Sequence, residues 1–324
     1  MVVNGKQPNR LDHRLYCDYA NLVKLQAHAD GFKLLPRLCA GSALVGRHHS
    51  AFRGRGLNFE ELRHYQHGDD IRNLDWKVTL RTGKPHIRSY TEEKDRNVMI
   101  CVDQRSSMFF SSVAVMKAVV AAEVAALTAW RVLKDSDRVG FVISTTDELV
   151  WSTPKRSQRD TLLQLSQLAQ ANQRLSAISR DSSEVGFDRL IALLNQLKCR
   201  NTTIIILSDW SGVTDDGIHH LKYLQKHNNV LGVLITDPLE TSLLTESTNG
   251  TQGFVPWVVA DGDYQLNLHR KPQVDKASAG LAHHYQLKKQ QLLKLMTIQH
   301  LPMIELGTGG DHLAKFKGMV GGLV

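Results

Sequence analysis

The sequence predicts an α/β fold in which helices cover both faces of a doubly wound, mostly parallel sheet. From residue 97 onward, short continuous apolar runs recur, and such runs are typical of strands buried on both faces. Helical patterns separate the runs at the spacing of strand–helix–strand units. Hydrophobic residues make up 42% of the chain and charged residues 22%, which favours a folded protein over a disordered one.

The elements of this region can be assigned in order along the chain. The predicted strands are NVMICVD at 97–103, DRVGFVIST at 137–145, TTIIILSD at 202–209, VLGVLITD at 230–237 and PMIEL at 302–306, with VPWVVAD at 255–261 as a further candidate. The predicted helices are an apolar one at 113–133, then 159–171, 187–198, 216–227 and a long polar one at 278–300. The apolar helix contains Lys117 and Glu123, so we expect it to be buried in a soluble protein rather than to span a membrane.

Two further segments precede the α/β region. Apolar residues at helical spacing before Pro36 predict a short N-terminal helical lead within residues 1–40. Residues 41–95 are rich in glycine and arginine and lack long apolar runs, so this segment is a poor candidate for an independent core. We therefore expect a lead at 1–40, a segment at 41–95 that packs on the core, an α/β domain at 96–265, and a C-terminal helix and strand at 266–324 that complete this domain.

Charge and cysteine content bear on partners and location. The net charge is +8, but basic and acidic residues alternate, which favours a solvated surface over a nucleic-acid site. The four cysteines are scattered without a CxxC pair, as expected in a reducing compartment. The first residues do not resemble a signal peptide, and no apolar run has membrane-spanning length. We expect a cytoplasmic protein without a membrane span.

Three predicted strands end in an aspartate, at Asp103, Asp209 and Asp237. Ligands of open parallel sheets bind beyond the carboxyl ends of the strands, so these carboxylates should gather along one rim. Hydroxyl groups follow or precede them at Ser106, Ser107 and Ser208. Carboxylate and hydroxyl oxygens suit a hard cation such as Mg²⁺. The alternative is that each aspartate only caps the turn or helix that follows it.

Two motifs resemble known families. DQRSSM at 103–108 resembles the Asp-x-Ser-x-Ser start of the metal-ion-dependent adhesion site in von Willebrand factor A domains, with Asp103 and Ser107 at matching positions and Asp209 as the later aspartate. The segment 59–93 closely resembles the signature of the bacterial domain-of-unknown-function 58 family. The matching residues are Glu60, Arg63, Tyr65, Gly68, Asp69, Asp70, Arg72, Asp75, Trp76, Arg81 and Glu92.

The resemblance implies a three-layer αβα, von Willebrand factor A-like domain and an association with MoxR-type AAA+ ATPases. It implies no known reaction. We therefore expect a non-enzymatic protein-interaction module, an adaptor or scaffold that acts with such an ATPase on a client protein. The expected contact residues are Asp103, Arg105, Ser107 and Asp209. The alternatives are a metal-dependent hydrolase that uses the same carboxylates and a basic nucleic-acid-binding protein.

The sequence departs from the adhesion-site pattern at Arg105, which replaces the middle serine. The usual threonine ligand is also missing from the segment 182–190, where Ser182 and Ser183 are weak substitutes. An arginine carries a fixed positive charge and no acceptor. We predict that it takes the place of the cation, pairs with Asp103 and, as a second candidate, with Asp209, and offers its charge to a carboxylate of the partner. No cofactor is then expected; if Arg105 points to solvent instead, Mg²⁺ could bind at Asp103, Ser107 and Asp209.

We expect the segment 41–95 to pack on the α/β domain as a fixed collar. Tyr65, Leu74 and Trp76 are large apolar groups that favour burial, and arginine–carboxylate pairs are strongest when they are shielded beside such groups. The predicted ion-pair network consists of Arg63, Asp70, Arg72 and Asp75. The alternative is a solvated charged loop.

Overall fold

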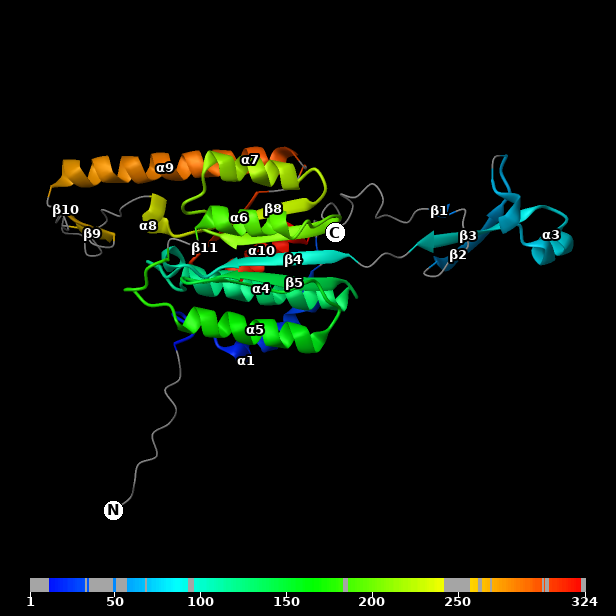
Figure 1. Cartoon of the computed structure of the whole chain (residues 1–324), viewed down its shortest axis with the longest axis horizontal. Coiled ribbons are helices and arrows are strands. Elements are labelled where there is room, and N and C mark those ends of the chain that lie inside the picture. Colours follow the sequence, from blue (N-terminus) through cyan, green and yellow to red (C-terminus); the bar gives the residue numbers. More distant parts are fainter. Residues whose placement is uncertain are drawn as a thin grey trace, which may run out of the picture. The chain divides into compact units, whose positions relative to one another are not determined.

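The computed structural model describes residues 12–32, 34, 49–50, 57–67, 69–92, 96–182, 186–241, 257–261, 264–268, 270–298, 300 and 303–321. The chain forms two compact units. One consists of Met1–Leu38 together with Asn97–Val324, and the other is Cys39–Arg96. The larger unit contains the α/β fold and is shown with its elements labelled in Figure 1.

A six-stranded sheet forms the centre of the larger unit. Its strands, in spatial order, are β11 (Ile304–Gly307), β8 (Asn229–Thr236), β7 (Thr202–Ser208), β4 (Asn97–Asp103), β5 (Arg138–Ser144) and β6 (Leu149–Trp151). The first five strands are parallel, and only β6 runs antiparallel to its neighbour. This confirms the predicted mostly parallel sheet. The strand β6 has too few residues to give a periodic signal, and the sequence did not predict it.

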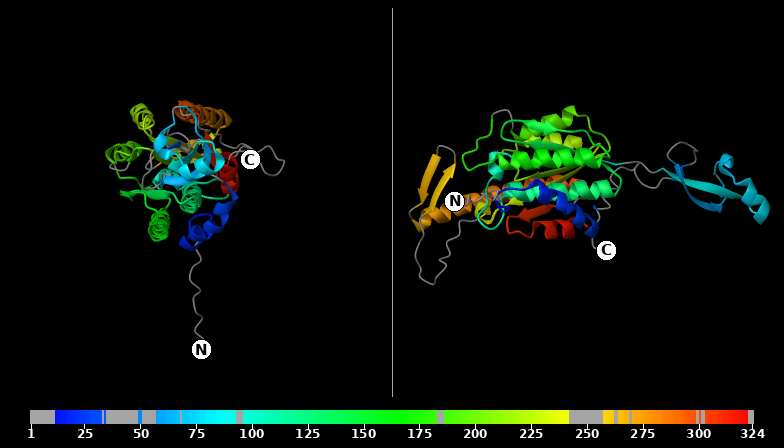
Figure 2. Two further views of the ribbon diagram at one scale, coloured as in Figure 1. Left: turned by 90° about the vertical axis from the view of Figure 1, so that its right-hand side faces the viewer. Right: turned by 90° about the horizontal axis from the view of Figure 1, so that it is seen from below.

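Helices cover both faces of this sheet, as Figures 1 and 2 show. One layer contains α4 (Lys117–Lys134), α5 (Gln158–Gln173) and α10 (His312–Val320), and the other contains α6 (Phe187–Gln196), α7 (Asp215–Leu224) and α9 (Lys271–Ile298). Helix α4 is buried over nearly its whole length, because alanine and valine let it lie close to the sheet on one side and to other helices on the other. The chain therefore has a three-layer α/β architecture, and none of its described helices is long and apolar enough to cross a bilayer.

The N-terminal lead belongs to the larger unit and packs outside α4 and α5. It consists of the helix α1 (Tyr19–Lys24) and a 3₁₀ helix, η1 (Leu25–Gly31). Leu22 is fully buried, and its carbonyl accepts a hydrogen bond from the Trp130 indole N–H at 3.0 Å. The Cys17 N–H donates to the Asn172 side-chain oxygen at 2.8 Å. These contacts attach the lead to the core.

The segment VPWVVAD does contain a strand, but that strand lies outside the central sheet. It forms β9 (Trp257–Asp261), which pairs antiparallel with β10 (Tyr264–Leu268) in a separate two-stranded hairpin. The long helix α9 follows β10 and begins seven residues before the predicted start. A short helix, α8 (Pro238–Thr241), follows β8.

The smaller unit is built on a three-stranded antiparallel sheet. Its strands are β1 (His49–Ser50), β2 (Leu57–His64) and β3 (His86–Glu92), in the order β1-β3-β2. A 3₁₀ turn, η2 (Ile71–Asn73), and the helix α3 (Trp76–Thr82) connect β2 to β3. The Trp76 side chain is 63% exposed, so the smaller unit does not bury it by itself. Its burial against the larger unit stays a prediction.

The ion pairs of the smaller unit differ from the predicted network. Arg63 pairs with Asp69 at 2.6 Å. Asp75 accepts from the Val78 N–H at the start of α3 and pairs with Arg88 at 2.7 Å. Asp70 accepts from the backbone of Arg72 and not from its guanidinium in the contacts described. Sequence reasoning missed Arg88 because this residue lies 13 positions after Asp75 in the chain. The pairing of β3 with β2, which the sequence did not predict, brings the two side chains together. The packing of this unit as a collar stays a prediction.

Candidate functional site

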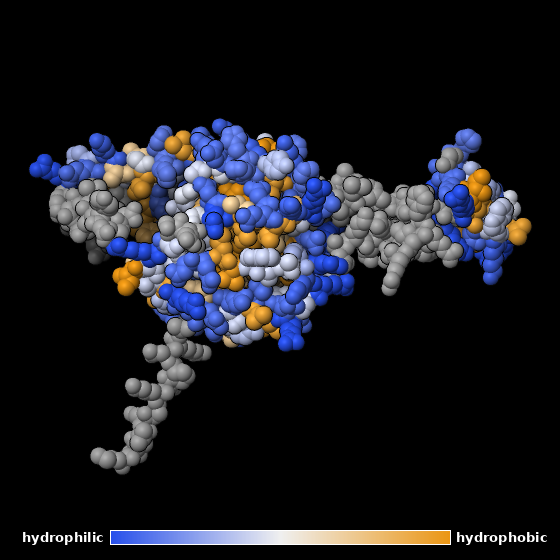
Figure 3. Space-filling model, in the orientation of Figure 1, coloured by the Kyte–Doolittle hydropathy of each residue, from blue (hydrophilic) through white to orange (hydrophobic). Residues whose placement is uncertain are grey.

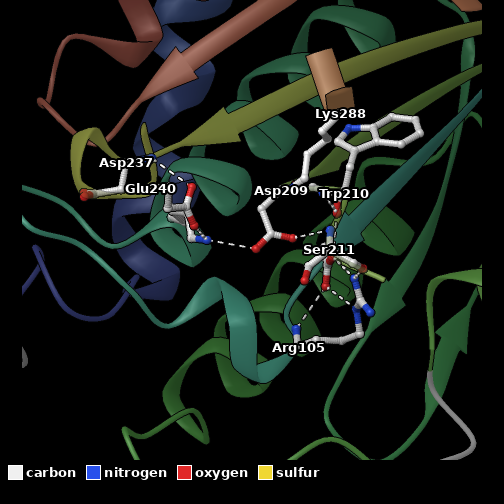
Figure 4. Close-up of polar contacts among 10 residues, drawn as sticks. Arg105, Asp209, Trp210, Ser211, Asp237, Glu240 and Lys288 are labelled. Carbon is white, nitrogen blue, oxygen red and sulfur yellow. Dashed lines mark hydrogen bonds and ion pairs between the residues drawn. The ribbon is translucent and has the colours of Figure 1, made fainter. Parts of the chain in front are cut away.

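The three predicted aspartates lie at the carboxyl ends of β4, β7 and β8. Figure 4 shows Asp209 and Asp237 at this edge of the sheet, together with Arg105. β4 and β7 are direct neighbours in parallel register, so the side chains after Val102 and Leu207 meet at the same edge. Ser208 donates a hydrogen bond from its hydroxyl to Asp103 at 2.6 Å. Both side chains are buried. The structure therefore brings the predicted carboxylate and hydroxyl groups of β4 and β7 into contact at one edge of the sheet.

Arg105 lies in this rim with its guanidinium held against Asp103. Its Nε donates to Oδ1 at 3.0 Å and its Nη2 to Oδ2 at 2.7 Å, which is the two-point geometry of a strong ion pair. Nη2 also donates to the Ser211 carbonyl at 3.1 Å, and the group lies 5.8 Å from the centre of the Phe187 ring. Arg105 is 5% exposed and Asp103 2%. The arginine therefore does not point to solvent.

Asp209 has a different cation, Lys117 at the first turn of α4. The Lys117 ammonium donates to Asp209 at 2.8 Å and also pairs with Glu240 of α8. Burial by itself would raise the pKa of Asp209, but Lys117 and the more distant Lys288 lower it well below its usual range. The prediction that Arg105 pairs with Asp209 as well is wrong, because Lys117 occupies that carboxylate.

The backbone around Asp209 is fixed by further contacts. Its second carboxylate oxygen accepts from the Ser211 N–H at 2.9 Å. The Lys288 ammonium, on α9, donates to the Asp209 carbonyl at 2.8 Å. Trp210 has a left-handed backbone, with φ of 58°, and its indole N–H donates to the Val233 carbonyl of β8 at 3.1 Å. The loop after β7 is thus held by both layers and by the sheet.

Asp237, after β8, serves as an acceptor for three segments. It accepts from the backbone and hydroxyl of Ser112, from the Thr308 hydroxyl at 2.6 Å and from the Leu239 N–H at 3.0 Å. Burial would raise the pKa of Asp237, yet these donors lower it. Asp237 therefore ties the loop before α4 and the end of β11 to the end of β8.

The remaining adhesion-site residues do not complete a metal site. The Ser107 hydroxyl is buried and has no hydrogen-bond partner among the described residues. The Ser182 N–H donates to the Thr146 carbonyl, and Ser183 lies outside the described residues. Within the described ranges, no group of three or more histidine, cysteine, aspartate or glutamate side chains is placed to hold a metal ion. With Arg105 and Lys117 against the two carboxylates, the residues present do not fit Mg²⁺.

Sequence reasoning missed Lys117 and Glu240. The available signal was a lysine at the first turn of a mostly apolar helix, since a lysine in that position is rarely buried without a partner. Its partners, however, lie 92 and 123 residues away along the chain. No local pattern connects them.

The surface next to the buried ion pairs is partly apolar. Phe110 is 39% exposed and Val113 is 60% exposed, both in the loop between β4 and α4. The Lys117 ammonium lies 5.8 Å from the centre of the Phe110 ring. The Glu240 side chain is 30% exposed, and Asp181, which accepts from the Ser106 N–H at 2.7 Å, is also exposed. An exposed aromatic ring thus lies next to the ion pair of Lys117 with the partly exposed Glu240.

The comparison with known families gives a match over residues 61–254 to the family described as Protein of unknown function DUF58. The match covers more than half of the chain. The chain belongs to the DUF58 family. This confirms the family resemblance seen in the segment 59–93. The match to DUF58 includes the rim residues Asp103, Arg105, Lys117 and Asp209, but it ends before Lys288.

Curated relatives and a solved structure show similarity at low identity. The uncharacterized proteins Mb1516 of Mycobacterium bovis and Rv1480 of Mycobacterium tuberculosis are each 24% identical over 220 residues, which are 68% of this DUF58 chain and 68% of theirs. The crystal structure of the conserved hypothetical protein BatB from Bacteroides thetaiotaomicron aligns with a TM-score of 0.35 at 14% identity, over 62% of this chain and 99% of BatB.

Proposed function

We propose that the rim at the carboxyl ends of β4 and β7 is a protein-docking site of a von Willebrand factor A-like domain, and that the chain is a non-enzymatic adaptor or scaffold. The observation that carries this proposal is the buried pair of Arg105 and Asp103. It stands at the residues that resemble the start of a metal-ion-dependent adhesion site. In this proposal the chain supplies its own cation where such a site uses a metal ion.

The two buried ion pairs act as a support for the docking surface. A carboxylate that is buried and paired fixes the loops on either side of it, and a rigid surface loses less conformational entropy when it binds. Arg105 is too deeply buried to receive a carboxylate from a partner, so the direct pairing expected from the sequence is not part of the proposal. The contact itself would be made by Phe110, Val113 and Glu240. Exposed aromatic and aliphatic groups beside charges are the usual chemistry of protein interfaces.

A MoxR-type AAA+ ATPase is the partner that we propose, with a client protein as a third component. The support for this partner is the resemblance of the segment 59–93 together with membership in the family. In this proposal the smaller unit, which contains the segment 59–93, takes part in binding the ATPase. This part of the proposal depends on the resemblance, and recovery of an AAA+ ATPase by the wild-type chain in the capture experiment below tests it.

A hydrolase that uses the same carboxylates is a weaker alternative. Such an enzyme needs a metal-bound water or a carboxylate able to accept a proton. Asp103, Asp209 and Asp237 instead each accept two or more hydrogen bonds from the chain itself. A nucleic-acid role would depend on the net charge alone. It predicts gel-shift affinities that fall steeply with salt, whereas the docking proposal predicts no such complex.

A capture experiment tests the docking site. The full-length chain is used as bait in a lysate of its source cells, and the retained AAA+ ATPase is measured by mass spectrometry. We expect Val113→Glu to reduce its recovery about tenfold or more, because a charge would be buried at the contact. Leu163→Glu, at a 55% exposed position on α5, is the matched control and should retain the ATPase. Equal recovery with both variants would contradict the proposed site.

A metal titration tests the role of Arg105. We expect Mg²⁺ and Mn²⁺ up to millimolar concentration to leave the melting temperature of the wild-type chain unchanged, since both rim carboxylates are already paired. Arg105→Ser restores the hydroxyl of the adhesion-site pattern and should gain stabilisation by metal. Clear stabilisation of the wild type at sub-millimolar metal would show that Arg105 does not replace the cation.

A further inference from the structure

The strand β6 forms one edge of the central sheet, and its outer side is available for pairing. Towards β5, the Thr145 N–H donates to the Glu148 carbonyl at 2.9 Å and the Ser152 N–H to the Phe141 carbonyl at 2.8 Å. The alternation of an antiparallel ladder then turns the N–H and C=O groups of Leu149 and Trp151 away from β5. Among the described residues, these outward groups have no hydrogen-bond partner.

We infer that this edge pairs with the same edge of a second copy of the chain, about a two-fold axis at Val150. In that arrangement Leu149 of each copy lies opposite Trp151 of the other. Each opposed pair exchanges two backbone hydrogen bonds, so all the outward groups of both strands are satisfied. The two central sheets then join into one continuous sheet. This inference is independent of the proposed docking site, which is built on β4, β7 and β8.

The side chains on this edge favour the same pairing. Trp151 is 47% exposed, which is unusual for a tryptophan without a partner. Beside it, a hollow of about 290 Å³ lies between β6 and α6, and its lining includes Leu149, Ala192 and Leu193. Figure 3 shows apolar side chains gathered on this face of the larger unit, between α6 and α5. In the pairing, Trp151 of each copy meets Leu149 and the hollow of the other.

The charges at the two ends of β6 identify a second copy as the occupant. Exposed Asp147 and Glu148 precede the strand, and exposed Lys155 and Arg156 follow it. Antiparallel pairing of two identical strands sets the acidic end of each against the basic end of the other. A strand with this charge order is complementary to itself, whereas an unrelated peptide would need the matching pattern by chance.

Two features limit the pairing to one register. At one end, the Thr146 carbonyl is already used by the Ser182 N–H. At the other, Pro154 has no N–H to donate. Edge strands that are short and bounded in this way do not extend into open aggregates. A two-fold contact of one surface with itself also closes at two copies, so the expected product is a dimer and not a filament.

The mass of the full-length chain in solution tests this inference. We expect light scattering across a concentration series to approach twice the chain mass of 36.3 kDa. Trp151→Arg should weaken self-association about tenfold or more. Tyr223→Arg changes a 58% exposed aromatic residue on α7 and should leave it unchanged. A single-chain mass for the wild type at every concentration would overturn the inference, as would equal effects of the two variants.

A cysteine variant tests the register. Val150 lies opposite itself at a position of the ladder without hydrogen bonds, where Cα atoms are about 4.5 Å apart, within the range of a disulfide. We expect Val150→Cys to form a covalent dimer on mild oxidation and Leu163→Cys, on the exposed face of α5, to form none above the wild-type level. If Val150→Cys links no better than Leu163→Cys, the two-fold pairing at β6 is wrong.

Discussion

At the scale of single residues, the main feature is that two buried carboxylates are each matched by a buried cation of the same chain. Taking an ion out of water costs several kcal/mol, and a partner recovers this only when its geometry is good. Asp103 meets that condition through the two-point contact with Arg105, and Asp209 through Lys117. The removal of one partner should therefore be far more damaging than the removal of both charges.

Arg105→Gln is predicted to lower the free energy of unfolding by about 3–5 kcal/mol, because it leaves the Asp103 carboxylate buried without its cation. The double variant Asp103→Asn with Arg105→Gln should recover most of that loss, since no uncompensated charge remains. Chemical denaturation of the four proteins of this cycle measures the coupling. Arg174→Ala, at an exposed position after α5, should change stability by no more than about 0.5 kcal/mol. Additive effects of the two rim substitutions would show that the residues are not coupled.

The lowered pKa of Asp209 predicts a pH dependence of stability. A carboxylate whose pKa is lower in the folded state stabilises the fold above the unfolded pKa and loses this effect as the pH falls. The wild type should therefore be more stable than Asp209→Asn at neutral pH, and the difference should shrink as the pH falls below about 4. Denaturation of both proteins across this range measures it. A difference that does not vary with pH would contradict the pairing with Lys117.

At the scale of elements, the close approach to β5 of the chain that follows β6 depends on one glycine of β5. A Cβ atom at Gly140 would lie 2.7 Å from the Ser152 carbonyl oxygen and 2.8 Å from the Pro154 nitrogen, both of them backbone atoms. The segment that follows β6 reaches α5 only because this space is empty. The same segment holds β6 against β5. The absence of a side chain at Gly140 therefore affects both the pairing of β6 with β5 and the position of the exposed edge.

Gly140→Ala is predicted to destabilise the chain by about 1–3 kcal/mol, since backbone must move to admit the methyl group. Gly280→Ala in α9 is the matched control: a Cβ there meets nothing within 4 Å, and alanine favours a helix. The control should leave the melting temperature unchanged or raise it slightly. Thermal unfolding of both variants measures the difference. Equal melting temperatures would show that a methyl group at position 140 causes no steric clash.

At the scale of the whole molecule, the chain consists of two compact units that are stabilised by different interactions. The larger unit has a three-layer core in which the N-terminal lead and the C-terminal elements take part. The smaller unit has a three-stranded sheet, and its described contacts include the pairs Arg63–Asp69 and Asp75–Arg88. A unit with little core of its own gains most from a neighbour on which it can pack, and this is the physical basis of the collar prediction.

Asp75→Ala is predicted to lower the melting temperature of the whole chain if the smaller unit packs as a collar. The substitution removes both the cap of α3 and the partner of Arg88. Its effect is read from two probes: hydrogen exchange in residues 57–92 and in the strands of the larger unit. Faster exchange in both units is the expected result. An effect confined to residues 57–92 would show that the units are stabilised independently.

The sequence by itself determined the main strands, the helices between them and the meeting of Asp103, Asp209 and Asp237 at one edge. These features follow from local periodicity, because a continuous apolar run is buried on both faces and parallel strands end on the same side. Only the tertiary structure decided that Lys117 pairs with Asp209, that β9 leaves the central sheet and that β6 forms its edge. Ion pairing and strand pairing are set by distances through space between residues far apart in the chain, and the local pattern of side chains carries no record of those distances.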